Sequence, residues 1–240
     1  YFNIRNIKGQ YPLYDFTTLK KMFLSNITIT DVYSLDRLFH SFAIAPWYAI
    51  SLVYFYNIRQ DGVFGSTSSY FISTNVIMIK WVVSRITDST NGVHILGTLS
   101  SNNHIKDSEF YDISYKQITL FLLQDNKYFF LFENCIFRDM KMDIGSSFAM
   151  PGVSTMRFLN STFHSLISFS NDLLISFNQG KIDVFGCLFA DIQTKSRGHI
   201  LNCGFGSECT IKQSKFESLF SMYEGTVARM TKVTNLLVIT

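Results

Sequence analysis

The chain has 240 residues, of which 47% are hydrophobic, 16% aromatic and only 16% charged. This composition excludes an intrinsically disordered chain, and the small net charge of +3, spread along the sequence, excludes the basic footprint of a nucleic-acid-binding protein. Its 24 Phe and 12 Tyr beside only 3 Pro favour an all-β fold, because aromatic side chains suit the pleated surface of a sheet.

One pattern recurs along the chain. An apolar residue is followed by a polar residue two positions later and by apolar residues five and eight positions later. In chain order the pattern fits residues 24–32, 50–58, 78–86, 105–113, 132–140, 158–166, 184–192 and 211–219.

The fifth position after the first apolar residue forms a central column of apolar side chains. Its members are Ile29, Phe55, Val83, Phe110, Phe137, Phe163, Phe189, Phe216 and Val238, separated by 26, 28, 27, 27, 26, 26, 27 and 22 residues. A period near 27 without a helical 3.6-residue pattern is typical of a three-sided β-coil. We therefore predict a right-handed parallel β-helix of about nine coils of about 27 residues, forming a single solenoid over residues 1–240 with the Phe column stacked inside.

A second column predicts where each coil bends. It contains Asn26, Leu52, Lys80, Asp107, Asn134, Asn160, Gly186, Gln213 and Asn235. Asn, Asp and Gly adopt a left-handed backbone at low cost, so we place a sharp bend between two sheets at this column. Because Leu52 and Lys80 depart from the rule, we expect coils two and three to bend differently.

The repeat starts and stops in mid-coil. Ile4 and Ile7 lie 25 residues before Ile29 and Val32, and residues 233–238 begin a coil that is not finished. Solenoid ends expose unpaired backbone and need caps, and no capping helix is predicted. We expect the chain to be a segment of a longer protein, or its ends to stack on neighbouring copies. The most apolar stretch, residues 42–56, contains Pro46 and is shorter than the ~20 residues of a spanning helix, so no membrane span is predicted.

Residues 158–166 and 182–192 resemble the pectin-lyase-like parallel β-helix repeat, in particular that of the long cell-surface repeat proteins of ciliates. The resemblance covers nearly the whole chain and implies an extracellular or cell-surface setting. It implies no particular activity, since the same solenoid serves lyases, hydrolases, adhesins and passive surface proteins.

Acidic residues occur at the column just before the last apolar position, where Asp112 and Asp139 should lie one coil apart. With Glu109 and Arg138 they are the candidates for an acidic groove that holds a cation or a glycan. The alternative is that the short polar side chains of this column bond to backbone at a turn, and we favour it. No catalytic residue, metal site or cofactor is predicted.

The four cysteines fall at inward positions. Cys135 and Cys187 occupy the place of Ser108, Ser161 and Ser214 two coils apart, beyond disulfide reach, and we predict that they are small core residues. Cys203 and Cys209 lie within one coil and either form a disulfide or join His199 at a weak zinc-like spacing. Two sequons, at Asn26 and Asn160, are possible N-glycosylation sites, unless the two Asn serve only at the bends.

Apolar side chains at outward positions indicate an interface, because stacked coils join them into patches. The candidates are Tyr54, Tyr56, Leu159, Phe185 and Leu188, unless loops of the same chain cover them. We therefore favour a non-enzymatic structural or adhesive segment of an extracellular surface protein or filament, whose partner is another copy, neighbouring segments of the same long chain, or a glycan. The alternative is a carbohydrate-active enzyme or a glycan-binding β-helix that uses the acidic groove.

Overall fold

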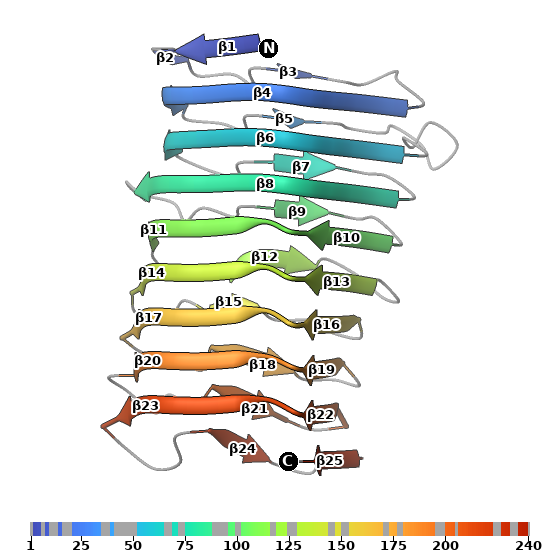
Figure 1. Cartoon of the computed structure of the whole chain (residues 1–240), viewed down its shortest axis with the longest axis vertical. Helices are drawn as coiled ribbons and strands as arrows, with labels where there is room; N and C mark the ends of the chain where they lie inside the picture. Colours follow the sequence, from blue (N-terminus) through green and yellow to red (C-terminus); the bar gives the residue numbers. More distant parts are fainter. Residues whose placement is uncertain are drawn as a thin grey trace.

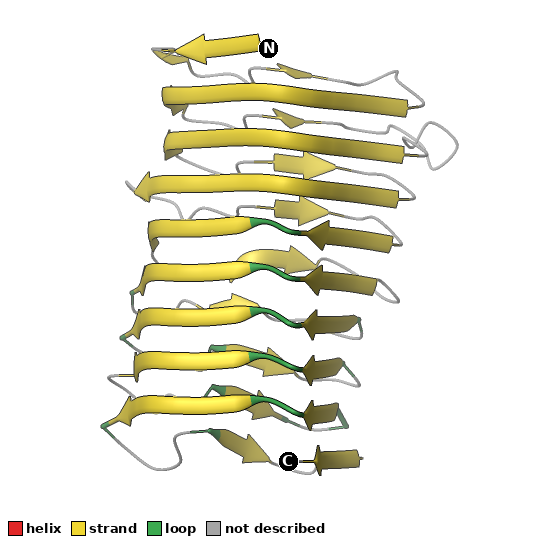
Figure 2. Cartoon of the chain, viewed as in Figure 1, coloured by secondary structure: helices red, strands yellow, loops and turns green. Residues whose placement is uncertain are grey.

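Parallel β-strands wind around a single axis, and each described pairing is parallel. In the computed structural model, strands at the front of Figure 1 run leftward and those behind run rightward as the chain descends, so the winding is right-handed. The structure describes residues 2–5, 8–9, 14–15, 21–34, 39–40, 52–64, 69–71, 75–87, 96–98, 102–115, 119–123, 129–143, 147–149, 154–169, 173–176, 180–194, 200–204, 206–222, 227–230 and 235–239. Within these residues the fold is all-β (Figure 2), and no helix is long and apolar enough to cross a membrane.

Three series of strands form the three sides of the solenoid. The back series, a 9-stranded sheet among the described residues, contains β3 (Tyr14–Asp15), β5 (Phe39–His40), β7 (Ser69–Phe71), β9 (Leu96–Thr98), β12 (Thr119–Leu123), β15 (Ser147–Ala149), β18 (Leu174–Ser176), β21 (Leu201–Cys203) and β24 (Ala228–Met230). The second series contains β10 (Asn102–Lys106), β13 (Phe129–Glu133), β16 (Thr155–Leu159), β19 (Lys181–Phe185), β22 (Glu208–Lys212) and β25 (Asn235–Ile239). The third contains β11 (Glu109–Tyr115), β14 (Ile136–Met142), β17 (Thr162–Ser168), β20 (Leu188–Thr194) and β23 (Lys215–Ser221).

In the first coils the second and third series are continuous. The long strands β4 (Lys21–Ser34), β6 (Leu52–Phe64) and β8 (Asn75–Thr87) each run along both sides, with β1 (Phe2–Arg5) and β2 (Lys8–Gly9) paired to β4. The first part of β8 pairs with β10 and its last part with β11. The three-sided coil predicted from the period is therefore confirmed.

The predicted bend column has a left-handed backbone. The φ angle is positive at Asn26, Lys80, Asp107, Asn134, Asn160, Gly186 and Gln213. The expectation that Lys80 would bend differently was therefore wrong, because its backbone takes the same conformation despite its long side chain. Hydrogen bonds between neighbouring coils continue through the bend, as in Asn134 N–H to Leu159 O at 3.0 Å, and this pairing imposes the conformation.

The Phe column is a stack of rings inside the solenoid. Phe110, Phe137, Phe163, Phe189 and Phe216 pair in register on successive coils. Their ring centroids lie 4.7–5.1 Å apart with interplanar angles of 3–20°. Four of the five rings are fully buried, and Phe216 is half-buried. The stack confirms the predicted inside and outside of the coils from β11 onward.

The predicted register fails near both ends. Phe55 pairs with Leu24 and Met78, and Gln60 stands opposite Ile29 and Val83 where Phe55 was expected. Position 57, not Leu52, therefore lies at the bend of the second coil. Val238 pairs with Ile211. The Phe column consequently ends at Phe216, one step earlier than predicted, and Asn235 lies opposite Glu208 rather than in the bend column.

A column of small residues follows the bend and lines the core. Ser108, Ser161 and Ser214 each donate a hydrogen bond from Oγ to the carbonyl two residues earlier, at 2.7–2.9 Å. Each also accepts one from a backbone N–H of the preceding coil, from Trp81, Cys135 and Cys187 respectively, at 3.0–3.2 Å. The hydroxyls thus satisfy backbone groups that the bend turns inward.

Candidate functional site

The predicted acidic groove is a closed set of ion pairs on the third side. Arg138 donates from Nε to Glu109 Oε1 at 2.8 Å and from Nη1 to Asp139 Oδ2 at 2.7 Å. Its guanidinium also lies over the Tyr111 ring, 4.2 Å from the centroid. The structure therefore brings Glu109, Arg138 and Asp139 together, but one cation already occupies both carboxylates.

Asp112 and Asp139 belong to a second column of left-handed residues. The φ angle is positive at Arg85, Asp112, Asp139, Ser165, Asp191 and Ser218, five residues after the six bends from Lys80 to Gln213. This geometry supports the turn interpretation, because short polar side chains tolerate the left-handed conformation. Among the described residues, no group of three His, Cys, Asp or Glu side chains could hold a metal ion.

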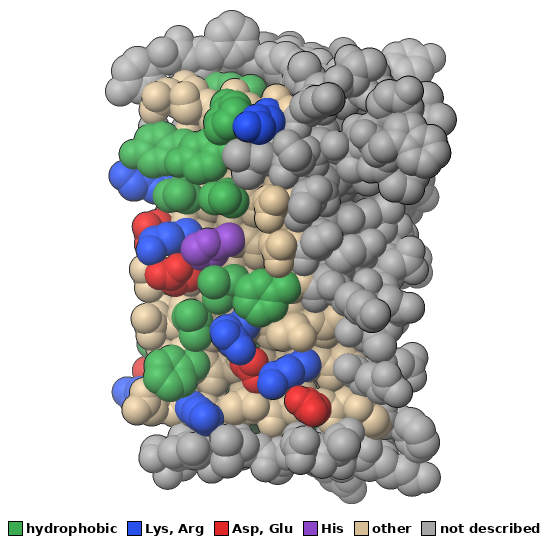
Figure 3. All heavy atoms as spheres, turned by 90° about the vertical axis from the view of Figure 1, so that its right-hand side faces the viewer, with side chains coloured by type: hydrophobic (Ala, Val, Ile, Leu, Met, Phe, Trp, Pro, Cys, Tyr) green, Lys and Arg blue, Asp and Glu red, His purple; other side chains and the backbone are tan. Residues whose placement is uncertain are grey.

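The outward side of the second series carries the other candidate residues, and we call it the lateral face. It comprises the outward side chains of β10, β13, β16, β19 and β22 and of the first parts of β4, β6 and β8, and Figure 3 views it directly. Side chains alternate between the two faces of a strand, so outward side chains at equivalent positions of successive coils form rows along the solenoid axis.

The first coils present a predominantly apolar area on this face. We call it the aromatic patch, and it consists of Phe23, Tyr54, Tyr56, Ile77 and Ile79. The Phe23 side chain is 62% exposed, and its ring lies 6.0 Å from that of Tyr54. Lys80 borders the patch with Nζ 5.4 Å from the Tyr56 ring centroid.

A charged cluster follows in the next coils. Glu133 accepts a hydrogen bond from Lys106 Nζ at 2.9 Å and contacts His104 Nε2 at 2.9 Å. The hydrogen bond from Lys106 lowers the pKa of Glu133 below its ordinary 4.5, although partial burial opposes the shift and His104 adds to it. The same pair raises the pKa of Lys106. These charges stabilise each other across two coils.

Below the charged cluster, the lateral face is hollowed into an open groove of ≈460 Å³. Its lining residues are Arg157, Leu159, Lys181, Asp183, Val184, Phe185, Thr210 and Lys212. Asp183 is only 8% exposed and is held by Arg157 Nη2 at 2.9 Å. Lys181 lies between Asp183, at 3.8 Å, and Glu208, at 3.5 Å. We call this site the groove.

The predicted interface residues separate into three places. Tyr54 and Tyr56 lie in the aromatic patch, while Leu159 and Phe185 are register partners in the groove, where Phe185 is 38% exposed. Leu188 lies on the third side in the row of Ile136 and Thr162, so it does not share a surface with them.

The two predicted sequons differ in exposure. Asn160 is exposed at its bend, whereas Asn26 is half-buried and takes part in a further interaction. Asn134, at the equivalent bend one coil earlier than Asn160, donates from Nδ2 to Asp107 Oδ1 at 3.0 Å.

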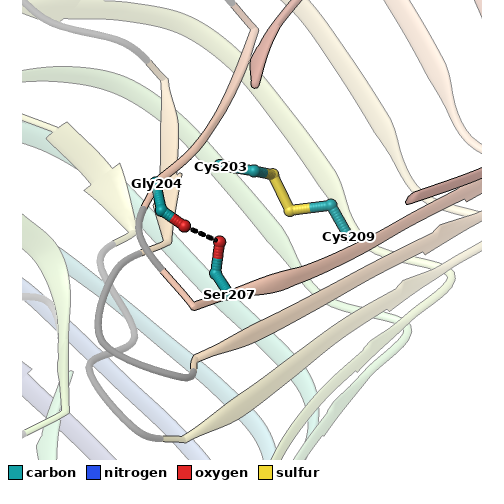
Figure 4. The surroundings of a disulfide bond; sticks show 4 residues. All are labelled: Cys203, Gly204, Ser207 and Cys209. Atoms are coloured by element: carbon teal, nitrogen blue, oxygen red, sulfur yellow. Dashed lines mark hydrogen bonds between the residues drawn. A yellow bond between two sulfur atoms is a disulfide. The ribbon is translucent and has the colours of Figure 1, made fainter. Parts of the chain in front are cut away.

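The cysteines are of two kinds. Cys203 and Cys209 form a disulfide across the corner between β21 and β22, with Cα atoms 6.5 Å apart (Figure 4). The corner itself is closed by a hydrogen bond from Ser207 Oγ to Gly204 O. This pairing decides between the two predicted roles of these cysteines, and His199 lies outside the described residues.

Cys135 and Cys187 are unpaired and buried, as predicted. Burial raises the pKa of the Cys135 thiol to about 12 and that of Cys187 to about 11. Both thiols therefore stay protonated and unreactive at neutral pH.

Sequence reasoning missed Phe23 and the polar lining of the groove. Phe23 stands outward by strand alternation, which could have identified it, since residues 24–32 were already placed on a strand. Arg157, Asp183 and Lys212 come from three strands and converge only through the register of the coils.

Comparison of the sequence with models of known protein families finds no match. A search of curated protein sequences likewise finds no matching relative.

Proposed function

We propose that this chain is a structural or adhesive segment of an extracellular surface protein or filament, and that it associates with other copies through its lateral face. The aromatic patch carries the proposal. It places Phe23, at 62% exposure, beside Tyr54 and next to further apolar side chains on a regular surface. Joined apolar patches of this kind mark protein interfaces more often than isolated exposed residues do.

Two further observations support the proposal. The Cys203–Cys209 disulfide fits an oxidising compartment, because disulfides are rare in proteins of the reducing cytosol. The carboxylates of the third-side cluster are neutralised by Arg138, which does not favour them as a catalytic acid and base.

The first test is the oligomeric state of the secreted chain. Sedimentation equilibrium over a range of concentrations should show self-association, and the double substitution Phe23→Ser with Tyr54→Ser should raise the dissociation constant by about tenfold or more. Phe220→Ser is the matched control, since Phe220 is 57% exposed but lies on β23 of the third side. A chain that stays monomeric at high concentration would argue against lateral self-association.

The redox state of the cysteines in the secreted chain tests the extracellular setting separately. Expressed in a secretory eukaryotic host, the chain should leave the cell with Cys203 and Cys209 linked and Cys135 and Cys187 as thiols. Peptide mapping by mass spectrometry, after alkylation without reduction, shows which cysteines are linked and which are thiols. Retention in the cell with four free thiols would contradict the extracellular setting.

A further inference from the structure

The sequon Asn160-Ser161-Thr162 lies at the edge of the groove. Asn160 follows Leu159, a groove residue. Its backbone N–H donates a hydrogen bond to Phe185 O of the next coil at 2.9 Å. Its side chain is exposed, and within the described residues no polar partner of the side-chain amide is found. The equivalent amide of Asn134 is instead engaged by Asp107.

The next coil leaves room for this side chain. Gly186 stands opposite Asn160 in the bend column, and a Cβ there would lie only 2.5 Å from Asn160 Oδ1. The Asn160 side chain therefore leans over the backbone of Gly186, directly after Phe185. Phe185, the residue before Gly186, is 38% exposed.

The adjoining surface suits a sugar ring. Pyranose rings have apolar C–H faces and hydroxyl groups at their edges. Leu159 and Phe185 offer an apolar floor, and Thr210 and Lys212 offer a hydroxyl and an ammonium beside it. Within the described residues Lys212 has no ion-pair partner that would occupy its ammonium.

We propose that Asn160 carries an N-linked glycan whose first sugar residue packs on Leu159 and Phe185 in the groove. The proposal rests on the extracellular function proposed above, since the transfer occurs during secretion. It assigns to the groove an occupant attached to the chain itself, and it leaves the aromatic patch as the surface for other copies.

The modification is a group transfer from a lipid-linked diphosphate oligosaccharide, catalysed by the transferase of the secretory pathway. The Asn160 Nδ2 atom forms a bond to the anomeric carbon of the first sugar, and the bond from that carbon to the diphosphate oxygen breaks. The lipid diphosphate leaves, the amide loses one proton, and no oxidation or reduction occurs. Transfer to the unfolded chain needs only the sequon, and the folded structure then has to accommodate the product.

The first experiment locates the glycan on the secreted full chain. Peptides are mapped by mass spectrometry after removal of N-glycans by a peptide amidase, which converts each glycosylated Asn to Asp. We expect conversion at Asn160, its loss in Thr162→Ala, and its retention in the matched control Thr162→Ser. Asn160→Asp should also lose the glycan while keeping a side chain that tolerates the left-handed bend.

The outcomes distinguish this proposal from the proposed function. A secreted, disulfide-linked chain with unmodified Asn160 overturns the glycan and leaves the extracellular setting intact. Retention in the cell with reduced Cys203 and Cys209 overturns the setting itself. Conversion at Asn26 without Asn160 would also refute the assignment.

The second experiment tests the packing of the glycan. The rate at which the amidase releases the glycan from folded protein is compared between the wild type, Phe185→Ser and the control Phe220→Ser. A glycan held against Phe185 should be released several-fold faster from Phe185→Ser and at the wild-type rate from Phe220→Ser. Equal rates for all three proteins would show that the sugar does not occupy the groove.

Discussion

At the residue scale, the solenoid depends on backbone conformations that most side chains avoid. Each coil from β8 to β23 has one left-handed residue at the bend and a second one five positions later. A left-handed L-residue costs roughly 1–2 kcal/mol, and Asn, Asp and Gly lessen that cost. Lys80 and Arg85 adopt the same conformation, so pairing with neighbouring coils outweighs the local preference.

Gly186 is a left-handed bend position where a new side chain should carry this cost. Its φ is +64°, and a Cβ would lie 2.5 Å from Asn160 Oδ1. Gly186→Ala should lower the free energy of unfolding by about 1–3 kcal/mol, measured by urea denaturation of unglycosylated protein. In the double variant with Asn160→Gly, part of the loss should return. A Gly186→Ala protein as stable as the wild type would show that the backbone there is not strained.

The charged cluster predicts a pH dependence. The pKa of Glu133 is lowered in the folded protein, so its ion pair stabilises the fold above the unfolded value near 4.5 and loses this effect as the pH falls through the lowered pKa. Glu133→Gln should therefore lower the melting temperature at pH 7 but not in strong acid. Glu217→Gln, which removes the partner of Lys215, is the control at another position. An equal effect of Glu133→Gln at both pH values would contradict this account.

At the element scale, the column of Ser and Cys after the bend joins neighbouring coils. Each Ser hydroxyl accepts a hydrogen bond from a backbone N–H of the preceding coil, as Ser161 Oγ does from Cys135 N–H at 3.2 Å. The Cys members of the column direct their thiols to the carbonyl two residues earlier in the same way, at 3.4 Å. Ser and Cys are thus interchangeable in volume at this column but unequal as hydrogen-bond acceptors.

Substitutions at Ser161 should separate volume from hydrogen bonding. Ser161→Val keeps a small buried side chain but leaves the Cys135 N–H without a partner, and should cost about 1–3 kcal/mol of stability. Ser161→Cys should cost less, because sulfur still accepts weakly. Chemical denaturation of both variants measures the difference, and a more stable Ser161→Val protein would refute the role of the hydroxyl.

At the scale of the whole molecule, the described strands of each coil pair with strands of the coils beside it, so a change in one coil acts mainly on its neighbours. Phe163 stacks between Phe137 and Phe189, at 4.8 and 4.7 Å. Phe163→Leu should cost about 1–3 kcal/mol through imperfect packing and three lost ring contacts, the two stacked ones and an edge-on contact with Phe158 at 5.3 Å. Hydrogen exchange should rise most in β14, β17 and β20 and least in β8 and β10. A uniform rise along the chain would indicate one cooperative unit instead.

The period of the repeat predicted the fold because five Phe residues keep the same phase from coil to coil. The repeat gave the wrong register at residues 52–58, because consecutive residues there are apolar. Placing either Phe55 or Gln60 in the central column, five residues apart, fits the pattern equally well. The repeat also gave the wrong register at Val238, whose apolar neighbours fit either side of a coil. Leu159 and Phe185 could be predicted as outward neighbours from strand alternation, whereas the groove depends on side chains of three coils.

The burial of Cys135 and Cys187 has a consequence for how the chain acquires its disulfide. Four thiols in an unfolded chain allow three complete pairings. In the wound chain Cys135 and Cys187 lie two coils apart with raised thiol pKa values, whereas Cys203 and Cys209 are six residues apart and close enough to be linked. If the coils wind before oxidation, the separation of Cys135 from Cys187 therefore disfavours wrong disulfide pairings.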